Sequence, residues 1–99
     1  MATRSYRYTF GPVVSMQEVE ETLMLAALAA EGIHGRSRIM LDAAFRLDPA
    51  ARTCVVDAGT PAGESIATVF TEFLSREIGE GAFRVERSDA PVRGRSEAA

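Results

Sequence analysis

Apolar residues in this chain recur at every second position in some segments and at helical spacing in others. The order of these two patterns along the chain constrains its fold more than any other feature. Residues Ser5 to Phe10 alternate, with three aromatic side chains on one side, as a half-buried strand does. Residues Met16 to Glu31 and the segment from Pro61 repeat their apolar positions at helical spacing. Apolar residues again occupy every second position in three later segments, at residues 38–46, 52–57 and 82–87. We therefore expect the order strand, helix, strand, strand, helix, strand.

Local signals predict where both helices begin and where the first one ends. Ser15 and Glu18 have the spacing of a capping box, in which the serine oxygen accepts an otherwise unpaired backbone N–H. Gly32 is the expected C-terminal stop of the first helix. Thr60 is expected to cap the second helix, with Pro61 in the first turn, where its missing N–H is no loss.

The predicted order is the βαββαβ order of a ferredoxin-like domain. We predict an α+β two-layer sandwich, in which a four-stranded, mostly antiparallel sheet has two helices on one face. The chain has 99 residues, enough for one domain. We assign residues 1–88 to that domain. Residues 89–99 carry mainly charged and small side chains, and we interpret them as a disordered tail.

One face of the predicted sheet is covered by the helices and the other is open. We expect Ile39, Leu41 and Phe45 to point toward the helices, together with the aromatic residues of the first strand. The open face would carry Arg7, Met40 and Asp42 among other mixed residues. Asp42, in the middle of a strand, could form a cross-strand ion pair with Arg7 or serve as a polar group of a pocket.

The first helix is apolar around nearly its whole circumference between Leu23 and Ala30. A helix lying on a sheet needs only one apolar stripe. Its alanines could simply be good helix formers, which leaves a few large side chains to explain. The alternative is a self-association surface on this helix, the open sheet face, or both. The interface candidates are Met24, Leu25, Leu28 and, on the open face, Met40.

Reactive residues are few and isolated. Cys54, the only cysteine, falls on the core side of its predicted strand, as a buried small hydrophobe does. His34, the only histidine, is expected in an exposed loop between glycines, where a general acid or a ligand-binding group is the alternative. No spacing matches a metal site, a phosphate-binding loop or a catalytic triad, so we expect no cofactor and no metal.

These observations favour a non-catalytic interaction or regulatory module that forms a homodimer. One alternative is a small-ligand-binding protein or small enzyme, with a pocket on the open sheet face near Arg7, His34 and Asp42. The other is an accessory subunit that binds a different protein. The net charge of −3 argues against a nucleic-acid partner. The apolar run of Leu23 to Ala30 is far shorter than the ~20 residues of a membrane span, and we expect a cytoplasmic location.

Overall fold

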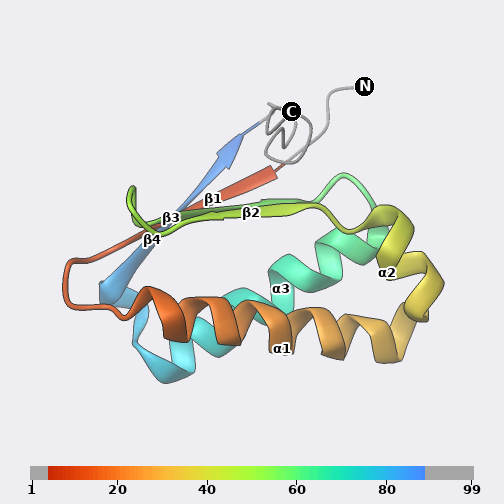
Figure 1. Ribbon diagram of the computed structural model, residues 1–99, viewed down its shortest axis with the longest axis horizontal. Helices are drawn as coiled ribbons and strands as arrows, with labels where there is room; N and C mark the ends of the chain where they lie inside the picture. Colours follow the sequence, from red (N-terminus) through yellow and green to blue (C-terminus); the bar gives the residue numbers. More distant parts are fainter. Residues whose placement is uncertain (1–4, 89–99) are drawn as a thin grey trace.

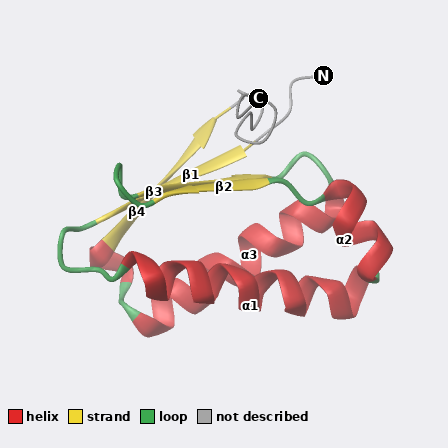
Figure 2. Cartoon of the chain, in the orientation of Figure 1, coloured by secondary structure: helices red, strands yellow, loops and turns green. Residues whose placement is uncertain are grey.

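The computed structural model describes residues 5–88, which form an α+β fold in two layers (Figure 1). A sheet lies over a layer of helices, and all the helices are on the same face of it (Figure 2). In chain order the elements are β1 (Ser5–Phe10), α1 (Met16–His34), α2 (Arg36–Asp42), β2 (Phe45–Asp48), β3 (Thr53–Asp57), α3 (Pro61–Glu77), a 3-10 turn (Glu80–Ala82) and β4 (Phe83–Ser88).

The sheet has four strands within the described range, in the order β2-β3-β1-β4, and every neighbouring pair is antiparallel. Its register sets which side chains share a face. Tyr8 lies opposite Cys54 on one side and Val85 on the other, and this row points toward the helices. The next row along β1, through Arg7, points away from them. The predicted alternation of β1 is therefore confirmed.

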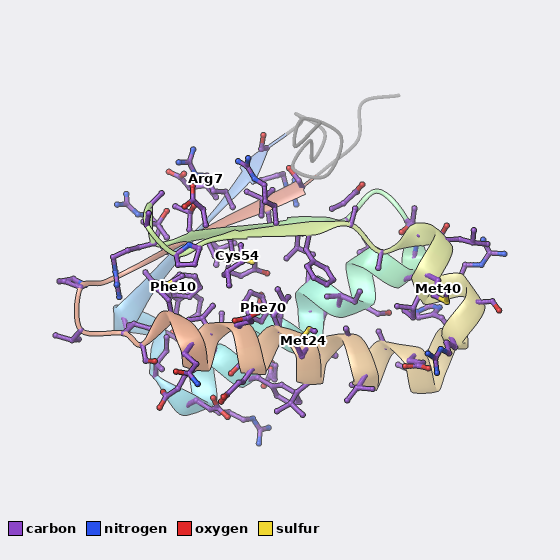
Figure 3. The ribbon with its side chains drawn as sticks, viewed as in Figure 1. Arg7, Phe10, Met24, Met40, Cys54 and Phe70 are labelled. Carbon is purple, nitrogen blue, oxygen red and sulfur yellow. The ribbon has the colours of Figure 1, made fainter. Side chains whose placement is uncertain are left out.

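The core fills the space between the sheet and the two long helices. Phe70 of α3 meets Tyr8 of β1 edge to face, with ring centroids 4.8 Å apart, and both side chains are fully buried. Figure 3 shows Phe10, Cys54 and Phe70 in this layer and Arg7 on the outer side of the sheet. The buried stripe of α1 faces the same core and consists of the apolar residues Val19, Leu23, Ala26 and Ala30 together with Thr22.

Helix α1 extends beyond the predicted stop at Gly32. It continues to His34, and Gly35 ends it with a φ of 90°, a conformation that favours glycine. Both predicted N-terminal caps are present. The Ser15 hydroxyl accepts a hydrogen bond from the Glu18 N–H, and the Thr60 hydroxyl accepts one from the Gly63 N–H.

The predicted strand at residues 38–46 is wrong in its first half. A seven-residue helix, α2, occupies Arg36–Asp42, and the strand β2 begins only at Phe45. A short apolar run of this kind fits the apolar spacing of a strand as well as that of a helix. In this structure its backbone forms helical hydrogen bonds instead of pairing with another strand. Ile39 still packs partly buried against the core, but Leu41 is 75% exposed rather than facing the helices. Residues 5–88 therefore form three α-helices instead of the expected two.

The other predicted elements lie close to their expected positions. β3 and β4 each begin one residue later than the sequence suggested, and a 3-10 turn leads into β4. The predicted tail at residues 89–99 lies outside the described residues.

Candidate functional site

The outer side of α1 carries three large apolar side chains that nothing else in the described chain covers well. Met24, Leu25 and Leu28 are 53%, 51% and 62% exposed. They are on the side of the helix opposite the buried stripe, because residues three and four positions apart share a helix face. We call these three residues the α1 face. The predicted excess of apolar surface on this helix is therefore present.

Helix α2 adds more exposed apolar surface at the C-terminal end of α1. Met40 and Leu41 are each 75% exposed. Figure 3 shows Met40 on α2, beyond the end of α1, whereas Met24 lies near the middle of α1. Met40 is therefore exposed as predicted, but it belongs to the helix layer and not to the open sheet face. Sequence reasoning missed the exposure of Leu41 because it placed this residue in a strand.

The open face of the sheet is charged. One row across it runs from Arg46 through Val55 and Arg7 to Glu86. Arg46, Arg7 and Glu86 are exposed, and Val55 is half-buried among them. A surface of this composition resembles an ordinary solvated sheet face more than an apolar interface.

The three candidate ligand-binding residues do not form one site. Arg7 is exposed on the open face. His34 is not in a loop: it is the last residue of α1, half-buried, with Nε2 2.8 Å from the Ser65 hydroxyl. Asp42 is not in a strand: it ends α2, and its carboxylate pairs with Arg38 at 3.4 Å. The expected pairing of Arg7 with Asp42 is therefore wrong, because Asp42 is not in the sheet.

A groove of about 670 Å³ lies on the helix side of the molecule, beside α3. Tyr6 of β1 and Val85 of β4 contribute apolar surface to it, and Glu64 and Glu72 of α3 contribute carboxylates. Its other lining residues are Ile33, Ser65, Ala67, Thr68, Val69 and Thr71. None of the three candidate ligand-binding residues lines it, although Ser65, the hydrogen-bond partner of His34, does. No local sequence pattern predicts this groove, because the residues that line it are distant along the chain.

The Tyr8 hydroxyl, close to this groove, is held in a small hydrogen-bond network. It lies 2.8 Å from the Thr71 hydroxyl and donates to the Ala67 carbonyl at 3.2 Å. Thr71 donates to the same carbonyl at 2.8 Å. Burial raises the pKa of Tyr8 to about 12, so the phenol is neutral at physiological pH. This network fixes the ring in the core, and its polar atoms already have partners.

Among residues 5–88, Arg52 is the only residue other than glycine with a positive φ, and the sequence analysis did not single it out. Its φ is 59°, in the left-handed region that a side chain rarely adopts. Its guanidinium donates to the carbonyls of Gly11 and Val14, and its own carbonyl accepts from the Phe10 N–H. These bonds attach the β2–β3 turn to the segment between β1 and α1. The role of Arg52 in this arrangement is structural.

Cys54 is fully buried, and burial raises the pKa of its thiol from 9.0 to about 12. At pH 8 its thiolate population should therefore be about a thousandfold lower than that of an unperturbed thiol. We expect the native protein to resist a thiol-specific chromogenic reagent at this pH. The same protein in concentrated urea should react at once. Fast stoichiometric labelling of the native protein would contradict the buried position of Cys54.

Among residues 5–88, no group of three or more His, Cys, Asp or Glu residues is arranged to hold a metal ion. In the same part of the chain, no helix combines the length and the apolar character that crossing a bilayer requires.

The chain matches no known family model, and no curated protein or solved structure matches it either.

Proposed function

We propose that this protein is a non-catalytic interaction module that associates with a second copy of itself through the α1 face. The observation that carries the proposal is the exposure of Met24, Leu25 and Leu28 on the outer side of a well-packed helix. Contiguous apolar surface of this kind is typical of interaction sites. The charged row across the open sheet face makes that surface the weaker candidate.

The expected affinity follows from the size of the α1 face. Burying the exposed half of a leucine or methionine side chain contributes about 1–1.5 kcal/mol. The three side chains from each copy would together contribute about 6–9 kcal/mol, which is comparable with the association cost of about 4–15 kcal/mol. The most favourable ends of these two ranges leave about 5 kcal/mol, which corresponds to a dissociation constant of about 0.2 mM, so we expect a weak dimer. Additional contacts from Met40 and Leu41 would strengthen it.

The proposal includes a ferredoxin-like topology and a cytoplasmic location. The topology is supported by the strand order β2-β3-β1-β4 and by the antiparallel pairing of all neighbours. The departure from the simple βαββαβ pattern is α2, a seven-residue helix inserted between α1 and β2. The cytoplasmic location rests on the sequence pattern alone.

Replacing both leucines of the α1 face with glutamate tests the proposal. At a concentration of about 1 mM we expect the wild-type chain to sediment mostly as a dimer. We expect Leu25→Glu/Leu28→Glu to sediment as a folded monomer, because burying these charges is unfavourable. Analytical ultracentrifugation measures both states, and circular dichroism checks the fold. Val13→Glu is the matched control, because Val13 is apolar and 93% exposed but lies outside α1. A monomeric wild-type chain, or a double variant that still dimerises, would refute the proposal.

The groove beside α3 favours a second candidate function, the binding of a small ligand. Its volume of about 670 Å³ is within the usual range of ligand pockets, about 300–1,000 Å³. Of its lining carboxylates, Glu72 is exposed and pairs with Arg76 at 3.7 Å, and a positively charged ligand would compete for this carboxylate. Native mass spectrometry of the freshly purified protein separates the two candidates. A retained small molecule would support the groove, and a bare dimer would support the interaction module.

A further inference from the structure

The residues along the outer side of α1 are spaced symmetrically about the middle of the helix. Glu21, Leu25, Leu28 and Gly32 follow one another at intervals of four, three and four residues. This is the spacing of a coiled-coil contact line. The sequence of intervals is the same in both directions, with its midpoint between Leu25 and Leu28. Two copies that cross antiparallel at this midpoint would place each Leu25 beside the partner's Leu28.

Gly32 lies at one end of this row, where a bulky side chain would hold the helices apart. A Cβ added at Gly32 would meet nothing within 4 Å, so its surface is open. In the antiparallel arrangement Gly32 faces Glu21 of the other copy. The absence of a side chain at Gly32 leaves room for the methylene groups of that glutamate, as small residues do at close helix contacts.

The charges along α1 and α2 are distributed unevenly. The exposed residues of the first half of α1 include Glu18, Glu20 and Glu21, whereas the second half carries one acidic residue, the half-buried Glu31, and α1 contains no lysine or arginine. The exposed arginines Arg36 and Arg38 follow directly at its C-terminal end, in α2. Two parallel copies would bring the acidic segments together. Two antiparallel copies would bring the acidic segment of each to the basic segment of the other.

The positions along α1 agree with this pairing. At a rise of 1.5 Å per residue, Glu21 lies about 8 Å from the midpoint of the row, and His34, the last residue of α1, lies about 11 Å from it in the opposite direction. Arg36 begins α2, directly after Gly35, whose φ of 90° ends α1. In an antiparallel pair the acidic first half of each α1 would therefore lie near the C-terminal end of the other α1, which Arg36 follows. Opposite charges at such a contact between helices favour one orientation.

We infer that the partner of the α1 face is a second copy of this chain, bound antiparallel about a two-fold axis between Leu25 and Leu28. Attraction between the acidic first half of α1 in one copy, which includes Glu21, and Arg36 at the C-terminal end of the other α1 favours this direction. The inference rests on the proposed self-association and adds its geometry.

Charge reversal at these two positions tests the geometry. In the antiparallel dimer, Glu21→Arg places two cations together and Arg36→Glu places two anions together. We expect each single variant to raise the dissociation constant about tenfold, and the double variant Glu21→Arg/Arg36→Glu to restore it, because the reversed pairs attract again. Sedimentation equilibrium at low ionic strength measures all four proteins. Arg46→Glu, on the open sheet face, is the matched control and should leave the dissociation constant unchanged.

The outcomes separate the geometry from the proposed function. Recovery of affinity in the double variant supports the antiparallel pair. If the wild-type chain dimerises but both single variants keep its dissociation constant, or the double variant is weaker than either, this geometry is wrong while self-association stands. A wild-type chain that remains monomeric overturns both.

A distance measurement gives the direction independently of charge. Gln17 is exposed in the first turn of α1, and spin labels on Gln17→Cys would lie about 30 Å apart in the antiparallel dimer and about 10–15 Å apart in a parallel one. Electron–electron double resonance distinguishes these distances. The buried Cys54 should remain unlabelled, and the wild-type protein treated with the same label is the control. A distance in the shorter range would overturn the antiparallel arrangement.

Discussion

Replacing Phe70 with alanine is expected to lower the free energy of unfolding by about 3–5 kcal/mol. Phe70 is fully buried where α3 packs beneath the sheet, and its ring meets that of Tyr8 at 4.8 Å with an interplanar angle of 65°. The substitution removes the buried ring, leaves a cavity and abolishes the aromatic pair. Because a domain of this size is stable by only about 5–15 kcal/mol, the variant would lose a large share of its stability.

Urea denaturation followed by circular dichroism measures this loss. Val13→Ala is the control, because Val13 is 93% exposed and its truncation should change the free energy of unfolding by less than about 0.5 kcal/mol. The measurement should be made on the monomer, so that dimerisation does not contribute to the measured stability. A loss below about 1 kcal/mol for Phe70→Ala would mean that Phe70 is not at the centre of the core.

The long elements could be predicted because each carries several independent signals. The first strand combines alternation with three aromatic residues, and the structure places it in the middle of the sheet. The second long helix combines a capping threonine, a proline in its first turn and a wide apolar stripe, and it forms at Pro61–Glu77. In these segments the helix or strand propensity, the apolar spacing and the capping residues all favour the same structure. Tertiary contacts therefore stabilise the structure that the local sequence already favours.

Helix α2 could not be predicted, since its evidence is short and ambiguous. The run from Ile39 to Leu41 fits a strand as well as a helix. What distinguishes the two is the place of the segment in the fold: α2 rises from the C-terminal end of α1 toward the sheet (Figure 1). Because Asp42 was assigned to the same strand, the error also placed this candidate ligand-binding residue on the wrong surface.

The exposure of the apolar residues on α1 was predicted better than the positions of the candidate ligand-binding residues, and the reason is physical. Exposure on a helix follows from its period, so Met24, Leu25 and Leu28 could be identified from one segment. A groove or a hydrogen bond depends on segments that are distant in the chain. The His34 ring forms a hydrogen bond with the Ser65 hydroxyl where α1 packs against α3, and the Arg52 guanidinium donates to the Gly11 carbonyl in another loop. No local pattern contains that information.

Gly63→Ala is expected to destabilise the protein by about 3 kcal/mol, although alanine is the better helix former by about 1 kcal/mol. Gly63 lies in the first turn of α3, and a Cβ there would be 2.1 Å from the Asp57 carbonyl oxygen. That backbone cannot shift easily, because the Asp57 N–H donates to the Ala44 carbonyl at 2.8 Å and the Asp57 carboxylate accepts from the Gly59 N–H at 2.7 Å. The substitution must therefore break the β3–α3 connection or displace the start of the helix.

The matched control for this change is Gly32→Ala, which should have the opposite sign. Gly32 is also helical, but nothing lies within 4 Å of the position of its added Cβ. Alanine there gains helix propensity without a clash, so we expect the free energy of unfolding to rise by about 0.5–1 kcal/mol. Thermal and urea unfolding of both variants, at concentrations where the chain is monomeric, gives the two signs directly. If Gly63→Ala were also stabilising, the close approach of Gly63 to the end of β3 would be wrong, since propensity alone would then account for both glycines.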